Sequence, residues 1–379
     1  MSINNDTVNT FNRDILDLYG CLNSICDDKS NNESNCLDPA SLFNVLHLLF
    51  EGTAGDSRRE LESTNLKSMI KMIQKSIHSR SGIFIREGWT FVKDYLEKFK
   101  KNHAFDIVPT NMTSLENVNA NINETFPNWH QKDEAFFKKP LSSNCRICIK
   151  DQSYFQQNWK IPFLTKNTIF KEFYVGDKTI KIPTMIRDEE EYIQTYYDQK
   201  RNILFASLPY ASRDYVMFLM MPTVPHTKSQ LVDLVTNKII TAKDISDFYL
   251  QHGKRQRYHR KEMPKFEFNT QWRIDLKKID SEKYCSISYL KIITSNNLDL
   301  RNISKSLDPK SYEGISLTSI SDISNTETGT SIKSETSFMQ TDGVKRVLRI
   351  NRSFIYTIVK IIDDRHYIIS KLGLFVGPK

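Results

Sequence analysis

The chain has 379 residues, 39% of them hydrophobic and 11% aromatic, and a formal net charge of +8 at pH 7. No run of about eighteen apolar residues occurs, which excludes a conventional membrane-spanning helix, while the apolar content is ample for a sizeable core. The positive charge favours acidic partners, because net charge governs association rather than fold.

The N-terminus is polar and lacks the basic-then-apolar pattern of a secretory signal. We therefore predict a cytoplasmic protein, with secretion by an unconventional route as the alternative. No linker rich in Pro, Gly or Ser divides the chain, which favours one mixed domain.

Helices are predicted in the first third of the chain, where apolar residues recur with helical spacing, and strands in the rest. The helices cover residues 42–50, 66–77 and 88–101. The strands cover residues 146–155, 180–186, 203–208, 214–221, 263–268, 314–323, 353–361 and 366–376. The polar stretch 277–308 is left unassigned.

The helix over 66–77 carries a basic stripe beside its apolar face. Lys67, Lys71 and Lys75 recur every four residues, with Arg80 at the end of the stripe. Lysines at this spacing share one face of a helix and predict an anion-binding stripe. The alternative is a solvated helix face.

A denser basic run follows at residues 254–261, and it contains Lys254, Arg255, Arg257 and Arg260. It precedes Met263-Pro264 and is predicted to lie on a strand. We interpret it as a site for a polyanion or an acidic protease surface. The alternative is a strand edge kept soluble by its charge.

Six cysteines in a chain of this length do not indicate a disulfide framework. Cys145 and Cys148 have metal-binding spacing, but no second pair lies near them and structural zinc needs four ligands. They are predicted to be buried thiols. Cys21, Cys26 and Cys36 are interpreted as packing residues, with a regulatory disulfide as the alternative.

Sequence signatures of catalysis are absent: the chain has no Gly-X-Ser-X-Gly elbow, no His-Glu-X-X-His and no phosphate-binding or dinucleotide-binding glycine loop. We therefore predict a protein that is not an enzyme. An enzyme whose site is assembled from distant residues is the alternative.

Residues 327–337 combine a loop composition with the side-chain pattern of a strand. In an extended conformation, Ile332 shares one face with small polar residues, whereas Lys333 and Glu335 share the other. The uncharged face could therefore enter a sheet against a core. The alternative is a solvated loop.

Nine short blocks, in their order and spacing, resemble the serpins, a family of suicide-substrate protease inhibitors. The blocks are NCLDPAS (35–41), EGTAGDS (51–57), YFQQNW (154–159), PF (162–163), LPY (208–210), VMFLMMP (216–222), MPKF (263–266), ETGT (327–330) and SFIY (353–356). The resemblance covers roughly residues 11–379. It implies a single α+β domain with three β-sheets and eight or nine helices, and it leaves residues 1–10 as a short N-terminal extension.

The resemblance also implies a mechanism. An exposed reactive loop, here about residues 327–349, is attacked by a serine protease to form an acyl-enzyme. The cleaved loop then inserts into the central sheet and traps the protease. The alternative is a non-inhibitory serpin that acts as a carrier, chaperone or binding protein.

The resemblance assigns a hinge, a loop-entry region and a sheet-opening region. The hinge residues are Glu327, Thr328, Gly329, Thr330, Ser331 and Ile332. The loop-entry region contains Trp159 and an ion pair between Lys265 and Glu327. The sheet-opening region contains Asp38, Ser41, Asp151 and Ser319, where two carboxylates depart from the family pattern and would repel each other if they were close.

The reactive bond is left open among several positions. Counting from the hinge places it after Gly343, and counting back from Phe354 places it after Asp342. A longer loop would place Lys345 or Arg346 there, for a trypsin-like protease, and this assignment is preferred. A shorter loop gives Phe338 or Met339, for a chymotrypsin-like protease.

The predicted partner is thus a serine protease of trypsin-like or chymotrypsin-like specificity, together with a heparin-like polyanion. No cofactor, metal, membrane or specific nucleic acid is predicted, and the protein is expected to be a monomer.

Overall fold

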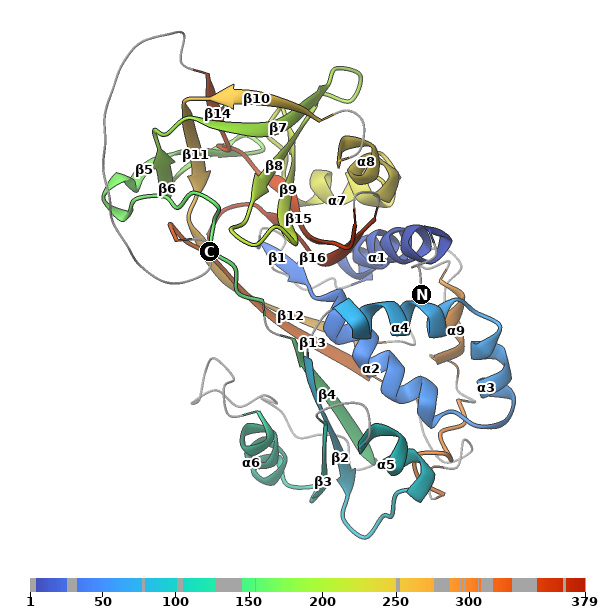
Figure 1. Cartoon of the computed structure of the whole chain (residues 1–379). Coiled ribbons are helices and arrows are strands. Elements are labelled where there is room, and N and C mark those ends of the chain that lie inside the picture. The colour runs from blue at the N-terminus through green and yellow to red at the C-terminus, as the bar shows by residue number, and fades with distance from the viewer. Residues whose placement is uncertain are drawn as a thin grey trace. The chain divides into compact units, whose positions relative to one another are not determined.

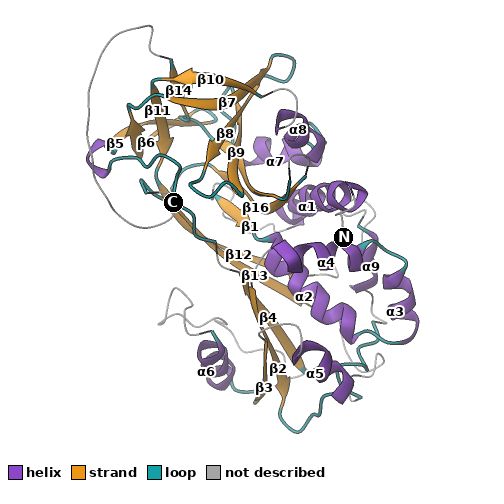
Figure 2. Ribbon diagram, viewed as in Figure 1, coloured by secondary structure: helices purple, strands orange, loops and turns teal. Residues whose placement is uncertain are grey.

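A computed structural model (Figures 1 and 2) describes residues 5–25, 33–76, 79–100, 105–126, 145–153, 155–249, 253–275, 287–293, 295, 298–305, 307, 316–328, 346–363 and 366–378. The chain divides into two compact units that interleave in sequence. The first contains residues 1–39, 155–286 and 317–379, and the second contains residues 40–154 and 287–316.

The first unit is built mainly from strands. Its helices are α1 (Asn5–Ile25), the short 3-10 helix η1 (Thr165–Asn167), α7 (Lys228–Thr236) and α8 (Ala242–Asp247). Its strands are β1 (Asn35–Leu37), β5 (Ile169–Val175), β6 (Lys178–Arg187), β7 (Glu191–Asp198), β8 (Ile203–Pro209), β9 (Tyr215–Pro222), β10 (Lys254–Tyr258), β11 (Arg260–Pro264), β12 (Phe266–Asp275), β13 (Ser316–Asn325), β14 (Val347–Arg349), β15 (Phe354–Ile361) and β16 (Tyr367–Phe375).

These strands form three hydrogen-bonded sheets. The largest has the order β1-β16-β15-β9-β8-β7-β10, the second has the order β14-β11-β6-β5, and the third pairs β12 with β13. Side chains alternate along the strands, so that Met217, Leu219 and Met221 of β9 enter one apolar cluster. Phe218, on the opposite face, packs against Phe248 just after α8, with 5.4 Å between ring centroids.

Aromatic rings fill the core of the first unit. Phe266 stacks on Phe375 with 4.6 Å between centroids, and Phe173 meets the same ring edge-on at 5.3 Å. Gly373 in β16 lies where a Cβ atom would collide with the Asn35 carbonyl and the Tyr356 ring. Only glycine therefore allows β1 and Tyr356 to approach this strand so closely.

The second unit holds the remaining helices and one sheet. Its helices are α2 (Pro39–Gly52), α3 (Gly55–Glu62), α4 (Leu66–Ser76), α5 (Lys93–Lys100), α6 (Leu115–Thr125) and α9 (Ser288–Ile293). The sheet order is β3-β2-β4, with strands Phe105–Thr110, Ser79–Arg86 and Ile147–Ser153. Within the part of the chain that is described, no helix is both long enough and apolar enough to cross a bilayer.

The α+β prediction is confirmed, and most predicted strands form within two residues of their expected limits. The strand predicted over 263–268 is wrong as one element. β11 ends at Pro264, which has no amide hydrogen for a ladder, and the chain passes into a different sheet at Phe266. The helix predicted over 88–101 begins only at Lys93, because Gly88 adopts a φ of 84° in the turn before it.

Two further differences concern the N-terminus and the thiols. Residues 5–10, predicted as an extension, form the first turns of α1, where Val8 is buried.

The single domain over 11–379 stays a prediction, because interleaved compact units can belong to one domain. Cys145 and Cys148 are free thiols but only half-buried, since they lie at the start of β4.

Candidate functional site

Residues 329–345 lie outside the described part of the chain, and the site therefore consists of the two anchors on either side of them. This excluded range contains the predicted hinge residues Gly329, Thr330, Ser331 and Ile332 and the predicted reactive-bond positions Phe338, Met339, Asp342, Gly343 and Lys345. The upstream anchor ends at Thr328, and the downstream anchor begins at Arg346.

Backbone hydrogen bonds fix the upstream anchor to the segment that precedes η1. The amide of Trp159 donates to the Thr328 carbonyl at 3.1 Å, and the amide of Phe163 donates to the Glu327 carbonyl at 2.6 Å. The indole of Trp159 donates to the Thr326 carbonyl at 3.0 Å. The chain that follows β13 is therefore held by contacts far away in sequence before it leaves the described region.

Trp159 can make these contacts because its ring is fixed. It stacks on Tyr210 with 4.7 Å between centroids and an interplanar angle of 6°. Trp159 is only 3% exposed and also meets Phe163 edge-on. A rigid buried ring presents its N–H group in one direction.

The carboxylate of Glu327 is the charged centre of the upstream anchor. Its side chain is 6% exposed and lies 3.0 Å from the ammonium of Lys265, which is 39% exposed. Thr168, just after η1, donates a hydrogen bond to the same carboxylate at 2.6 Å. Burial alone would raise the pKa of Glu327, but the contacts from Thr168 and Lys265 outweigh burial and lower it.

The structure thus brings together the three residues assigned to the loop-entry region, namely Trp159, Lys265 and Glu327. Sequence reasoning missed Thr168, which is 159 positions from Glu327. No local pattern marks this threonine, because its role depends on the tertiary position of η1.

The downstream anchor is a strand at the edge of the four-stranded sheet. β14 pairs in parallel with β11, with Val347 opposite Arg260. Arg346 is exposed, its carbonyl accepts the amide of His259 at 3.0 Å, and its guanidinium donates to Gln256 at 2.8 Å. Among the predicted reactive-bond positions, only Arg346 is described, and its backbone is already bound to a strand end.

The residues assigned to the sheet-opening region contact different partners. Asp38 is buried and forms an ion pair with Lys371. The Ser41 hydroxyl donates to the backbone carbonyl of Asp151 at 3.0 Å. Ser319 lies in β13, but its side chain is not among those described.

The predicted basic stripe is only partly on one helix. Lys67 and Lys71 are exposed on α4, while the apolar face that includes Met69 and Ile73 is buried. The side chain of Lys75 is outside the described set. Arg80 belongs to β2 rather than to the end of the helix, because the chain turns into a strand at Ser79.

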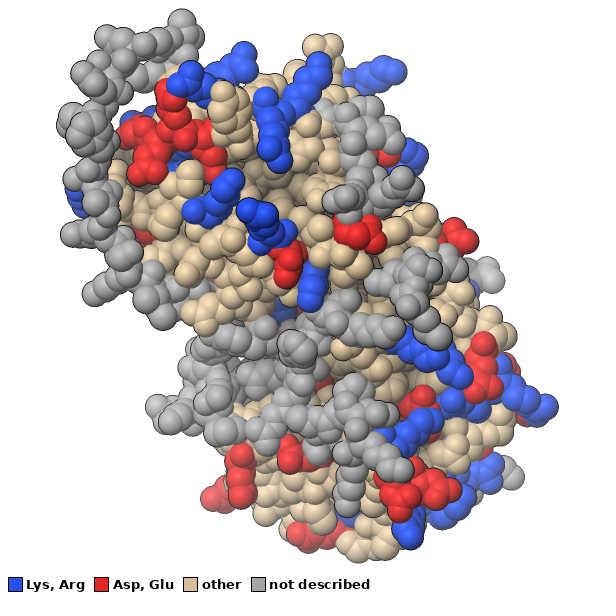
Figure 3. All heavy atoms as spheres, viewed as in Figure 1, with Lys and Arg blue, Asp and Glu red and all other residues tan. Residues whose placement is uncertain are grey.

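The basic run at 254–261 is divided between β10 and β11, and acidic residues neutralise part of it. Arg257 forms an ion pair with Glu190, and Arg260 lies 3.0 Å from Asp188. Lys254 and Arg255 are exposed and form no ion pair within the described residues. Figure 3 shows blue and red side chains side by side over the part of the first unit that holds β7, β10 and β14.

Over the described residues, no group of three or more His, Cys, Asp or Glu side chains is placed to hold a metal ion. Cys148 as a whole residue is half-buried, but desolvation of its thiol raises the pKa of that group to about 12, which makes it a poor ligand or nucleophile at neutral pH.

Comparisons with known proteins agree on one family. Residues 20–373 match the family model described as serpin (serine protease inhibitor). Serpin A3-1 of Bos taurus is 24% identical over 379 residues, which covers 92% of this chain and 85% of the relative.

Two solved structures show the same fold. Human thyroxine-binding globulin in complex with thyroxine has a TM-score of 0.74 at 16% identity, and the similarity covers 98% of this chain and all of that protein. Mouse protein-Z dependent protease inhibitor has a TM-score of 0.73 at 17% identity and covers 99% and 98% of the two chains.

Proposed function

The chain belongs to the serpin family, and we propose that it is a suicide-substrate inhibitor of a serine endopeptidase. The observation that carries the proposal is the anchorage of Glu327 and Thr328 at the end of β13. This anchorage fixes the point from which a loop could fold back as a strand. Within the described residues β13 is paired only with β12, so its other edge could accept that strand.

The chemistry follows from this geometry and from the family. The serine hydroxyl of the protease attacks the carbonyl carbon of one loop peptide bond, and the C-terminal part of the chain leaves with a protonated amine. The acylated loop pairs with the free edge of β13, which moves the attached protease. Lys333 and Glu335 stay on the exposed face of the inserted strand, while Ile332 is buried.

The reactive bond is assigned to Lys345 or Arg346, for a trypsin-like protease, because a basic side chain complements an acidic specificity pocket. A panel of trypsin-like and chymotrypsin-like proteases tests this assignment. An inhibitor forms an adduct that survives SDS, and the mass of the released C-terminal peptide gives the cleaved bond. Complete turnover of the loop without an adduct would contradict inhibition.

A non-inhibitory serpin is the second candidate. It is favoured by Ile332, whose branched side chain must be buried on insertion, and by the two carboxylates Asp38 and Asp151 in the sheet-opening region. Melting before and after proteolysis of the loop separates the candidates. An inhibitor gains thermal stability when its loop is cut, whereas a non-inhibitory serpin melts at the same temperature.

A heparin-like polyanion belongs to the proposal, with α4 as its site. Lys67 and Lys71 are exposed and form no ion pair in the described part of the chain, whereas acidic neighbours occupy Arg257 and Arg260. The double variant Lys67→Ala/Lys71→Ala should elute from heparin at lower salt than the native protein. The matched control is Lys178→Ala/Lys181→Ala on β6, whose lysines are also exposed; an equal shift for both variants would leave α4 without a specific role.

The cytoplasmic location and the monomeric state stay predictions, and cell fractionation and light scattering would test them.

A further inference from the structure

The downstream anchor depends on a very short strand. β14 contains only Val347–Arg349 and lies at the edge of its sheet, where β11 is its one partner within the described residues. The pairing is parallel, which is slightly less stable per residue than antiparallel pairing. Leu348 and Ile350 are buried on its inner side. Because so short a strand has few backbone contacts, its side chains contribute much of what holds it on the sheet.

Glu262 of β11 contacts this strand through both its backbone and its side chain. It lies directly opposite Arg349 in the parallel register, and its carboxylate is 3.2 Å from the Nε atom of Arg349. Its backbone carbonyl accepts a hydrogen bond from the amide of Ile350 at 2.9 Å. The side chain of Glu262 is 4% exposed, whereas that of Arg349 is 59% exposed. The strand is therefore joined to a buried carboxylate by a cation that reaches it from the surface.

Two further cations hold this carboxylate in place. The ammonium of Lys171 on β5 lies 2.7 Å from one oxygen, and the Nε atom of Arg260 donates to the other at 2.8 Å. Burial alone would raise the pKa of Glu262, but the contacts from Lys171 and Arg260, together with the charge of Arg349, outweigh burial and lower it. Glu262 is thus charged at neutral pH, and two residues outside β14 fix its position.

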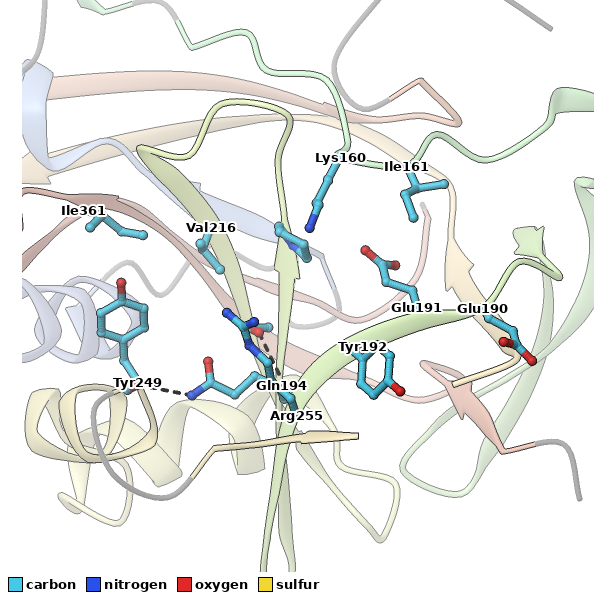
Figure 4. A pocket seen from close by; sticks show the side chains of 12 residues that line it. Lys160, Ile161, Glu190, Glu191, Tyr192, Gln194, Val216, Tyr249, Arg255 and Ile361 are labelled. Atoms are coloured by element: carbon cyan, nitrogen blue, oxygen red, sulfur yellow. Dashed lines mark hydrogen bonds between the residues drawn. The ribbon is translucent and has the colours of Figure 1, made fainter. Parts of the chain in front are cut away.

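The other acidic residues of this region bind different cations. Three of them follow β6, and their ion pairs are Asp188 with Arg260, Glu190 with Arg257, and Glu191 with Arg187. Figure 4 shows Glu190 and Glu191 pointing in different directions at the start of β7. Within the described residues, Glu262 is the only acid that forms an ion pair with a residue of β14.

We propose that Glu262 is a positioning residue for the reactive loop, because it fastens the downstream end of that loop to β11 through Arg349. The inference rests on the proposed function, since it concerns the same loop. An inserted strand advances about 3.3 Å per residue along its neighbour. A loop that is tied both at Thr328 and at β14 cannot insert far as a strand until one tie is released. The contact therefore keeps an intact loop outside the sheet, whereas cleavage frees its upstream part.

The variant Arg349→Gln tests the contact at its exposed end. It removes the cation of β14, while Lys171 and Arg260 still compensate Glu262, so folding should not be impaired. Hydrogen exchange of the backbone amides of residues 346–350, measured without any protease, reports how often β14 leaves the sheet. We expect exchange about three times faster than in the native protein, the change that corresponds to losing one partly exposed ion pair. Arg349→Lys keeps the charge and should exchange close to the native rate.

The matched control is Lys171→Gln. It removes another cation from the same carboxylate, but Lys171 lies on β5, at the opposite edge of the sheet from β14. Exchange of residues 346–350 should stay at the native rate. In a Glu262→Gln background, Arg349→Gln should have no further effect, because its partner is already neutral. An unchanged rate in Arg349→Gln, an equal increase in Lys171→Gln, or an undiminished effect in the Glu262→Gln background would each overturn the proposal.

A second measurement connects the strand with the reaction. During prolonged incubation, Arg349→Gln should lose the ability to form an SDS-stable protease adduct faster than the native protein and Lys171→Gln do, although all three share one urea midpoint. Equal rates of loss would remove the positioning role. If the native protein forms no adduct with any protease, the proposed function fails, whereas the exchange rates still decide whether Glu262 fastens β14.

Discussion

Glu327 in the first unit and Lys150 in the second unit are both buried ionisable residues, each 4% exposed as a whole residue, and both have lowered pKa values. The consequences are opposite. A lowered pKa means that the charged form of Glu327 is favoured in the folded protein, whereas for Lys150 it means that the neutral form is favoured.

The difference comes from the neighbours of each group. Glu327 has an ammonium at 3.0 Å and a hydroxyl donor at 2.6 Å, which together outweigh burial. Lys150 lies on β4 with its nitrogen 4.2 Å from the centroid of the Phe126 ring, and burial lowers its pKa to about 7 despite the nearby Cys148 and Asp151. At Glu327 the partners therefore outweigh burial, whereas at Lys150 burial outweighs the partners.

The largest expected effect on stability follows from reversing the charge of Glu327. Glu327→Lys would place two ammonium groups against each other beside Trp159, and we expect a loss of about 3–5 kcal/mol in stability. The hinge should also be released, which favours premature loop insertion or polymers. Urea unfolding and size-exclusion chromatography measure the two effects.

The matched control for this change is Glu267→Lys. Glu267 is an exposed glutamate on β12, and the same substitution there should change stability by less than about 1 kcal/mol. If both variants lost the same amount, the contacts of Glu327 would have no special importance.

The second-largest effect concerns Lys150, whose burial favours its neutral form. Lys150→Met should stabilise the protein at pH 7 by about 1–3 kcal/mol, because it removes the cost of burying a polar group. The folded pKa of Lys150 is about 7, below the ordinary value of roughly 10.4 in an unfolded chain. Between these values the unfolded state binds the extra proton, so the contribution of Lys150 to stability rises with pH.

Urea midpoints of the native protein and the variant between pH 7 and 10 check this prediction. The difference between them should shrink as the pH rises. Lys178→Met, at an exposed lysine on β6, should show no such trend. A constant difference across this range would contradict the titration of Lys150.

The smallest expected effect is the loss of one contact to Glu327. Thr168→Val removes the hydroxyl donor and should cost about 1 kcal/mol. The pKa of Glu327 is lower in the folded protein than in the unfolded chain. Glu327 therefore stabilises the folded protein at pH values above its unfolded-state pKa, and this contribution is lost as the pH falls through its folded-state pKa. The variant should therefore lose stability at a higher pH than the native protein does.

Acid unfolding curves give this comparison. Thr165→Val, at an exposed threonine of η1, is the control and should leave the curve unchanged. Identical curves for all three proteins would mean that Thr168 does not influence Glu327.

Strands with an apolar face could be predicted with their limits from the sequence, whereas the limits of strands without one could not. β9 and β15 carry long apolar runs and were predicted nearly to their limits. β10 has the sequence KRQRY, and this basic run was predicted to lie on a strand because it precedes Met263-Pro264, but no strand limits could be assigned to it. It forms because β7 offers an antiparallel partner along its whole length, and a partner so far away in sequence leaves no local pattern.

By itself, the sequence determined the α+β class, the apolar strands and, through the order and spacing of its short blocks, the serpin family. The tertiary structure alone decided which charges are compensated, because a salt bridge or hydrogen bond depends on a few ångströms between residues that are distant in the chain. Thr168 near Glu327 and Phe126 over Lys150 both arise in this way.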